Sequence, residues 1–164
     1  ASVEAGMLSI AGEKGTVTKN LLNPQVNITV QDNKIVLSAK SYSKSEKKVV
    51  NTFIAHMKNM FKGVVEGHTY KLRVCSGHFP MNVSIKGDGL EVKNFIGEAV
   101  PRTMKIKEGV QAKLDGDIIT LQGINKEVIA QTAASIERLT RRNGFDKRIF
   151  QDGIYIIEKD GKAL

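Results

Sequence analysis

The pattern of hydrophobic and polar positions predicts several strands before any other feature of the chain is considered. Val26, Ile28 and Val30 alternate with polar residues, which is the period of a half-buried strand. Asp32-Asn33 is a hairpin turn signal, and the apolar run that follows it returns along the first strand. The strands predicted in this way for the first half are residues 7–10, 17–22, 26–30, 35–37 and 70–74.

The period changes to that of a helix at two places. Ser43 followed three residues later by Glu46 is a capping-box pattern, and Gly63 is predicted to end the first helix. The apolar stripe of this helix is Val49, Val50, Phe53, Ile54, Met57, Met60 and Phe61. The stripe of the second helix is Val128, Ile129, Thr132, Ala133, Ile136, Leu139 and Thr140. The two stripes coincide when one is shifted by 79 positions, which indicates an internal duplication.

The segments around the helices repeat in the same order. Residues 93–96 resemble residues 19–22, and residues 118–121 resemble residues 35–37. The sequence therefore predicts an α+β fold with two duplicated domains, residues 1–77 and 78–164. Each is expected to be a small, mostly antiparallel sheet packed against one helix.

Charge and cysteine content narrow the possible partners. The net charge of +8 and the isoelectric point near 9.6 favour nucleic acid, or less often an anionic membrane. No apolar run approaches the roughly 20 residues of a membrane span. The single cysteine, Cys75, excludes an internal disulfide and fits a reducing cytoplasm.

The distribution of charge gives two conflicting indications. Residues 1–80 carry ten lysines and one arginine against five acids, a net charge of +6, whereas residues 81–164 have a net charge of +2. Five of the six arginines, however, lie in the second half. Arginine makes forked contacts with phosphate and stacks on bases, whereas surface lysine is more often a solubilising charge. The second half is therefore predicted to bind the polyanion.

The connection Arg141–Tyr155 is the predicted centre of an RNA-binding face. It combines four cationic residues with glycines and aromatic rings, whereas the equivalent connection after the first helix, residues 62–69, has one lysine and no arginine. Phe145 and Phe150 either anchor this loop as core aromatics or stack on bases. Asp146 and Asp152 are expected to hold the loop through backbone or arginine contacts. The basic segment 99–107 is either a tolerated loop or a binding element.

Motifs for other chemistry are not found in the sequence. No glycine-rich phosphate loop and no catalytic constellation is recognisable. Cys75 and His78 have the spacing of metal ligands, but a structural zinc site needs four ligands. We therefore predict no enzymatic activity, no metal, no cofactor and no small-molecule substrate.

Four motifs together resemble one known family. They are Gly77–Met81, Asn94–Glu98 with Pro101-Arg102, Asn125–Glu127 leading to Gln131–Ala134, and Arg148–Tyr155. Over nearly its whole length the chain resembles the large-subunit ribosomal protein six (L-six) family in its archaeal and eukaryotic form.

The resemblance implies a structural protein of the cytoplasmic ribosome. Its C-terminal domain would bind large-subunit rRNA near the sarcin–ricin loop and the region where translation factors bind, beside neighbouring large-subunit proteins. The rRNA-binding residues expected from the two matching segments and the helix before the loop are Asn94, Phe95, Gly97, Arg102, Arg138, Arg141, Arg142, Asn143, Lys147, Arg148, Gln151, Gly153 and Tyr155. A free-standing regulatory module that binds RNA or protein is the alternative.

Overall fold

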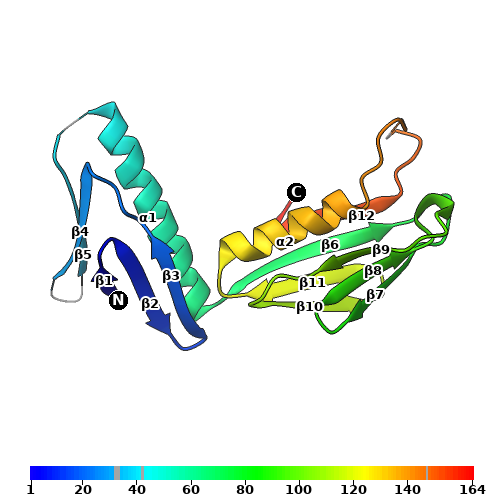
Figure 1. The fold of residues 1–164 in the computed structure, drawn as a ribbon, viewed down its shortest axis with the longest axis horizontal. Coiled ribbons are helices and arrows are strands. Elements are labelled where there is room, and N and C mark those ends of the chain that lie inside the picture. The colour runs from blue at the N-terminus through cyan, green and yellow to red at the C-terminus, as the bar shows by residue number, and fades with distance from the viewer. Residues whose placement is uncertain (32–33, 42, 147) are drawn as a thin grey trace. The chain divides into compact units, whose positions relative to one another are not determined.

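The computed structural model describes residues 1–31, 34–41, 43–146 and 148–164. The chain forms two compact units, residues 1–67 and residues 68–164, which we call the first and the second unit (Figure 1). The division predicted after residue 77 places the strand at residues 70–74 in the first half, but this strand lies in the second unit. The reason is its hydrogen-bond partners, which all belong to the second half.

The described residues of the first unit form two antiparallel sheets and one helix. One sheet has the strand order β1-β2-β3, and the other is the β4-β5 hairpin. The helix α1 packs mainly on β2 and β3. The elements are β1 (Ser2–Glu4), β2 (Met7–Gly12), β3 (Gly15–Asn20), β4 (Val26–Gln31), β5 (Lys34–Ala39) and α1 (Lys44–Val65).

The predicted start of α1 is confirmed and its predicted end is wrong. Ser43 and Glu46 form the capping box, in which each side chain accepts a hydrogen bond from a free backbone N–H. Gly63 lies within the helix, because Val64 continues the buried face and is only 2% exposed. The helix ends before Gly67, whose positive φ of 82° is the left-handed conformation that terminates many helices.

The buried face of α1 is narrower than the predicted stripe. Phe53, Met57 and Met60 are buried as expected, but Ile54 is 38% exposed and Phe61 45% exposed. A helical period fixes the centre of an apolar face, whereas the width that is covered depends on how many strands pack against it. In the first unit, β2 and β3 cover only one side of the helix.

Gly12 is where the β2–β3 hairpin meets α1. A Cβ atom at this position would lie 2.8 Å from Cβ and Cγ2 of Val64, and the N–H of Lys14 donates to the Val64 carbonyl oxygen at 3.1 Å. We expect Gly12→Ala to lower the free energy of unfolding by about 1–3 kcal/mol, because overpacking forces the helix away from the hairpin. Urea unfolding measures this. The exposed neighbour Ala11, changed to Ser, is the control, and equal midpoints for both variants would contradict the close approach.

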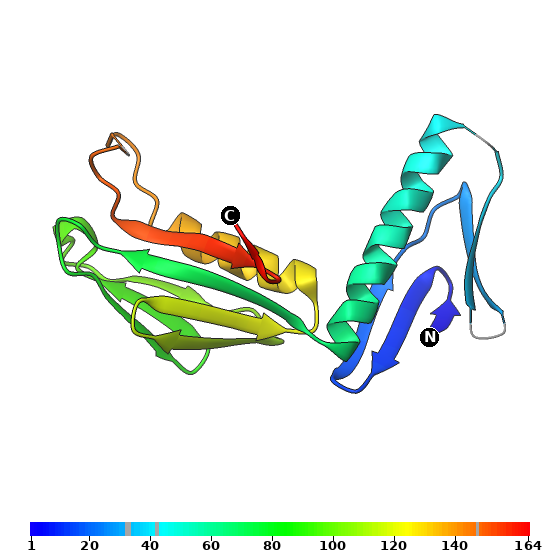
Figure 2. The same cartoon turned by 180° about the vertical axis from the view of Figure 1, so that it is seen from behind.

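The second unit is larger and also has two antiparallel sheets. One has the order β10-β11-β6-β12-β13, so that β6 lies between β11 and β12, and the other has the order β7-β8-β9. Its helix α2 runs along the five-stranded sheet (Figures 1 and 2). The elements are β6 (His68–Cys75), β7 (Asn82–Lys86), β8 (Gly89–Lys93), the 3-10 turn η1 (Phe95–Gly97), β9 (Arg102–Lys105), β10 (Val110–Asp115), β11 (Ile118–Gly123), α2 (Lys126–Leu139), β12 (Gly153–Lys159) and β13 (Lys162–Ala163).

The core of the second unit forms where α2 meets its sheets. Ile129, Ala133 and Ile136 of α2 and Leu72 and Ile119 of the sheet are completely buried. These helix positions belong to the predicted stripe, so the second helix is confirmed. The α+β class, the antiparallel pairing and the single helix of each unit are also confirmed. Each unit divides its strands between two sheets where the sequence predicts one.

The basic segment 99–107 is part of a sheet. Within it β9 pairs antiparallel with β8, and Ile106 is 5% exposed while its N–H donates to the Asp88 carbonyl oxygen at 2.7 Å.

No helix in the described part of the chain is long and apolar enough to cross a membrane.

Candidate nucleic-acid interface

The loop between α2 and β12, residues 140–152, rises from one end of the second unit (Figure 1). We call it the arginine loop. Its first residue, Thr140, is 4% exposed, and its hydroxyl accepts a hydrogen bond from the Ile154 N–H at 2.9 Å. The same hydroxyl donates to the carbonyl oxygen of Glu137 at 3.3 Å. The start of the loop is thereby fastened to both of the elements that it connects.

Asp152 fastens the other end of the loop. Its carboxylate is buried and accepts hydrogen bonds from the backbone N–H groups of Gly77, at 2.7 Å, and His78, at 3.0 Å. The ring Nδ1 of His78 lies 2.7 Å from the second carboxylate oxygen. Burial alone would raise the pKa of Asp152, but the hydrogen bonds from His78 and Gly77 outweigh it and lower the pKa to about 2. The expectation that Asp152 holds the loop through backbone contacts is confirmed.

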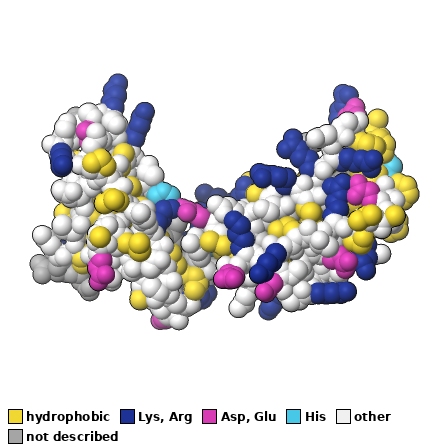
Figure 3. Space-filling model, in the orientation of Figure 1, with side chains coloured by type: hydrophobic (Ala, Val, Ile, Leu, Met, Phe, Trp, Pro, Cys, Tyr) yellow, Lys and Arg dark blue, Asp and Glu magenta, His cyan; other side chains and the backbone are white. Residues whose placement is uncertain are grey.

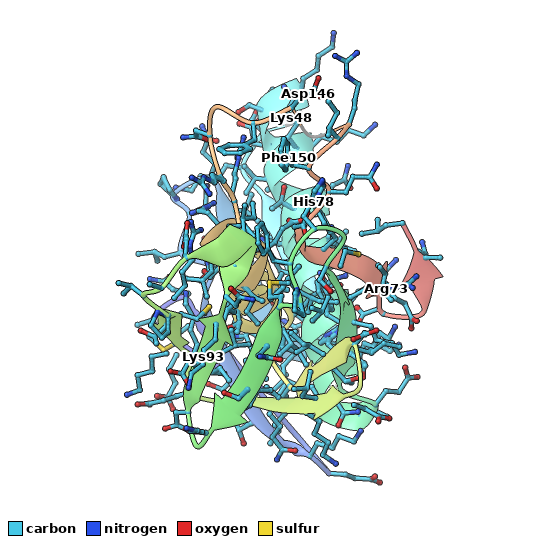
Figure 4. The ribbon with its side chains drawn as sticks, turned by 90° about the vertical axis from the view of Figure 1, so that its right-hand side faces the viewer. Lys48, Arg73, His78, Lys93, Asp146 and Phe150 are labelled. Carbon is cyan, nitrogen blue, oxygen red and sulfur yellow. The ribbon has the colours of Figure 1, made fainter. Side chains whose placement is uncertain are left out.

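A row of rings supports the middle of the loop. The His78 and Phe150 rings stack with centroids 4.7 Å apart, and Phe145 meets Phe150 edge-on at 4.8 Å. The guanidinium of Arg142 lies 4.3 Å from the centroid of Phe145. Figure 4 shows Phe150 and His78 one above the other below the tip where Asp146 lies. Both phenylalanines are partly exposed, so they anchor the loop and still present ring surface to solvent.

The tip of the loop is a turn built on Asp146. Its carbonyl oxygen accepts from the N–H groups of Ile149 and Phe150, at 3.1 and 2.8 Å, and its carboxylate accepts from the Arg148 N–H at 2.9 Å. The Arg148 guanidinium also pairs with this carboxylate at 2.8 Å, and its hydrogen bonds lower the pKa of Asp146. The Arg148 side chain is 90% exposed. Because exposed ion pairs are weak, a phosphate could replace the aspartate.

Residues 94–98 form a tight turn beneath the loop. Asn94, Ile96 and Gly97 have φ values of 58°, 48° and 75°, all in the left-handed region, and the Asn94 amide donates to the Pro80 carbonyl oxygen at 3.0 Å. The turn buries Phe95, which is 1% exposed. The Phe95 side chain is therefore a packing element of the second unit.

Arg102 joins this turn to the end of α2. Its Nε and Nη2 donate to the two carboxylate oxygens of Glu98, each at 2.7 Å, and its Nη1 donates to the carbonyl oxygens of Leu139, at 2.6 Å, and Arg141, at 3.3 Å. The guanidinium carbon lies 4.4 Å from the centroid of the Phe95 ring. These hydrogen bonds from Arg102 lower the pKa of Glu98 despite partial burial, and the charges of Arg102 and Arg142 add to the effect. Arg102 thus holds the end of α2 and the start of the arginine loop in place.

A cavity of about 340 Å³ opens between the end of α2 and the arginine loop. Arg138 and Arg141 are exposed at its wall, and Arg142 is half-buried there. Figure 3 shows Lys and Arg side chains gathered over this end of the second unit, with hydrophobic side chains and a histidine beside them. The residues that line the cavity are Phe95, Ile96, Ala134, Glu137, Arg138, Thr140, Arg141, Arg142, Phe145, Phe150, Asp152, Ile154 and Tyr155.

The structure brings part of the predicted rRNA-binding set together at this cavity. Phe95, Arg138, Arg141, Arg142 and Tyr155 all line it. Those outside its lining are Asn94, Gly97, Arg102, Asn143, Arg148, Gln151 and Gly153, of which Gly153 is buried. Lys147 lies outside the described residues.

Several residues of the site are not found by reading the sequence. Ala134 and Glu137 belong to the cavity wall, and His78 is the partner of Asp152. A signal for the first two exists, because Glu137 and Arg138 lie three and four positions after Ala134 on α2 and therefore share one helix face with it. No comparable signal links His78 to Asp152, since the two are far apart in the chain. Among the described residues, no group of three His, Cys, Asp or Glu side chains could hold a metal ion.

The fold and the site define a basic α+β protein with a duplicated chain, in which one copy carries a rigid arginine-bearing loop beside a cavity. A family model described as ribosomal protein L6 matches residues 1–67 and 79–153. The large ribosomal subunit protein uL6 of Methanococcus vannielii is 42% identical over 165 residues, which cover 99% of this chain and 91% of that protein. The uL6 protein of Methanosarcina mazei is 42% identical over 158 residues, covering 96% of this chain and 90% of that protein.

The chain therefore belongs to the ribosomal protein L6 family. The resemblance inferred from the sequence motifs is confirmed, and both relatives are archaeal, in agreement with the archaeal and eukaryotic form that the motifs indicate.

Proposed function

We propose that this protein is a structural, non-catalytic component of the large subunit of the cytoplasmic ribosome, and that its second unit binds large-subunit rRNA through the arginine loop. The site lies near the sarcin–ricin loop and the factor-binding region, so that neighbouring large-subunit proteins and translation factors are close. The observation that carries the proposal is the gathering of Arg138 of α2 with Arg141 and Arg142 of the arginine loop around one cavity, next to a loop that is fixed at both ends.

The rigidity of the loop supports this proposal. Folded RNA helices hide base edges in a deep major groove, so proteins recognise them mainly by shape and by contacts with phosphates and riboses. Such contacts depend on cations held at fixed positions. Thr140 and Asp152 fix the ends of the loop. The stacked rings of His78, Phe150 and Phe145, with the Arg142 guanidinium over Phe145, fix its middle.

The comparison between the two copies also supports it. The connection after α1 is short, Glu66–Gly67, and leads directly into β6. In the second unit the corresponding connection is a loop of 13 residues with three arginines. The scaffold therefore folds without these arginines in one copy, and a polyanionic partner accounts for them in the other.

Single substitutions of two loop arginines test the proposal. Arg141→Ala and Arg148→Ala are each expected to weaken binding to a large-subunit rRNA fragment and to reduce the slope of log K against log salt by about one unit, because each removes one phosphate contact. Filter binding of the full chain at several salt concentrations measures both quantities.

Lys113→Ala is the matched control, because Lys113 is an exposed cation of the same unit on the edge strand β10, which β11 and β6 separate from β12. Affinity and slope are expected to stay unchanged in this variant. If both arginine variants also bind like the unmodified protein, the arginine loop is not the binding face. Co-sedimentation with large subunits after a high-salt wash separates a subunit component from a free-standing regulator.

A further inference from the structure

The cavity at the end of α2 has the size and walls of a small-ligand site. Its volume of about 340 Å³ lies at the lower end of the range of about 300–1,000 Å³ that is common for such sites. Aromatic rings of Phe145, Phe150 and Tyr155 contribute to the wall. Unstacked RNA bases are commonly held against aromatic side chains of this kind.

The charged side chains that line the cavity differ in exposure and in hydrogen-bond partners. Arg138 and Arg141 are exposed and line the cavity, so a phosphate at the mouth of the cavity can reach their guanidinium groups. Glu137 is half-buried on the same wall, and within the described part of the chain its carboxylate takes part in no hydrogen bond or ion pair. The second acid, Asp152, is already occupied by Gly77 and His78. Glu137 is therefore the carboxylate that is available to a ligand.

A carboxylate beside aromatic rings and arginines favours one orientation of a nucleotide. Glu137 would repel a phosphate but accepts hydrogen bonds from the edge of a base. Guanine offers two parallel donors, N1–H and the 2-amino group, to one carboxylate. The phosphate then lies toward the exposed arginines, which bind it in a forked geometry.

We propose that this cavity receives a single unstacked nucleotide of the rRNA, with a preference for guanine, its base against Phe145, Phe150 and Tyr155 and its phosphate at Arg138 and Arg141. This inference rests on the proposed rRNA-binding function, because it specifies how one nucleotide is held within that interface. Tyr155 contributes a neutral hydroxyl, because a tyrosine phenol keeps its proton at neutral pH; partial burial raises its pKa further.

Three RNA hairpins of one sequence test the proposal with the full chain. The first carries a single bulged guanosine, the second an abasic site in place of that nucleotide, and the third is fully paired. We expect the bulged guanosine to bind at least about fivefold, and up to about a hundredfold, more tightly than the abasic hairpin, as stacking and edge contacts of one base allow. Filter binding at one fixed salt concentration gives the ratio.

Two variants connect the ratio to the cavity. Ala134→Met fills the cavity from a half-buried helix position with a good helix former, and is expected to bring the ratio to about one. A fourth hairpin carries a bulged uridine in place of the guanosine. Glu137→Gln keeps the cavity volume and is expected to remove the preference for the bulged guanosine over the bulged uridine. Lys113→Ala is the control and keeps both ratios. Thermal unfolding checks that each variant is folded.

The outcomes separate this proposal from the one on which it rests. Equal binding of the three hairpins by the unmodified protein, with the losses in Arg141→Ala retained, overturns the nucleotide site and leaves the rRNA-binding face standing. A guanosine-to-abasic ratio that survives Ala134→Met, or a preference for guanosine over uridine that survives Glu137→Gln, also overturns the nucleotide site. A protein that binds none of the hairpins and no rRNA fragment overturns both.

Discussion

Replacing Arg102 with alanine is expected to lower the free energy of unfolding of the second unit by about 2–4 kcal/mol. The guanidinium serves three partners at once, namely the Glu98 carboxylate, the carbonyl oxygens that end α2, and the face of Phe95. Its side chain is only 24% exposed. Removing one partner of a largely buried, hydrogen-bonded pair leaves the other without compensation, and this is more costly than the loss of an exposed ion pair.

Urea unfolding followed by circular dichroism measures the change, and hydrogen exchange at the amides of Ile129 and Ile136 assigns it to the second unit. Arg102→Lys is expected to recover only part of the stability, because lysine keeps the charge but cannot donate to Glu98 and to the helix end in a fork. Arg148→Ala is the control, since the Arg148–Asp146 pair is exposed and its loss leaves the midpoint unchanged. Equal unfolding midpoints for Arg102→Ala and Arg148→Ala would show that the contacts of Arg102 do not stabilise the second unit.

The ion pair between Arg102 and Glu98 also makes the stability of the second unit depend on pH. The pKa of Glu98 is lower in the folded protein than its ordinary value of 4.5. Its ionised form therefore stabilises the fold fully above about pH 4.5, and this contribution is lost as the pH falls through the lowered pKa. In Arg102→Ala this acid-dependent loss should be absent.

Replacing Asp152 with alanine is expected to release the arginine loop and to cost about 2–4 kcal/mol. The backbone N–H groups of Gly77 and His78 lose hydrogen bonds to a charged acceptor, and such bonds contribute about 1.5–3 kcal/mol each. The His78 ring loses its carboxylate partner as well, so the row of rings that begins at His78 is no longer fixed. We therefore expect weaker rRNA binding in addition to lower stability.

Thermal unfolding and hydrogen exchange at the amides of Gly77 and His78 measure the two consequences. Because the pKa of Asp152 is about 2 and its ordinary value is 3.8, its ionised form contributes fully above about pH 3.8 and loses this contribution as the pH falls toward 2. Asp146→Ala is the control, because Asp146 orders only the exposed tip. Unchanged hydrogen exchange at the amides of Gly77 and His78 in Asp152→Ala would show that Asp152 does not fix the end of the arginine loop.

Local features of the fold could be predicted from the sequence, because they depend on neighbouring residues. The capping box of α1 and the buried stripe of α2 are examples, since both follow from spacing along one helix. The exposure of Ile54 and Phe61 could not be predicted, because the helical period does not state how many strands cover the helix. The place of β6 could not be predicted either, because hydrogen-bond partners distant in the chain decide it.

For the candidate site too, local features could be predicted from the sequence, whereas contacts between distant residues could not. Composition and the comparison of the two copies identify the arginine loop, and helical spacing places Arg138 on the same face of α2 as Ala134. The role of Arg102 is different, because the sequence does not show whether the five donors of an arginine find partners within the protein. The structure shows that Glu98, Leu139 and Arg141 accept four hydrogen bonds from the Arg102 guanidinium.

The place of β6 between β11 and β12 determines the order in which this chain can fold during synthesis. Leu72 pairs with Ile119, and Val74 pairs with Ile154 near the end of the chain. The first unit is complete as soon as residue 67 has left the ribosome that makes it, whereas β6 follows immediately and waits for both neighbours with its apolar side unpaired. Pairing over such sequence distances is slow and exposes intermediates to aggregation. We expect the first unit to fold co-translationally and the second only after β12 has been synthesised and has emerged, with a refolding rate limited by the closure of this central strand.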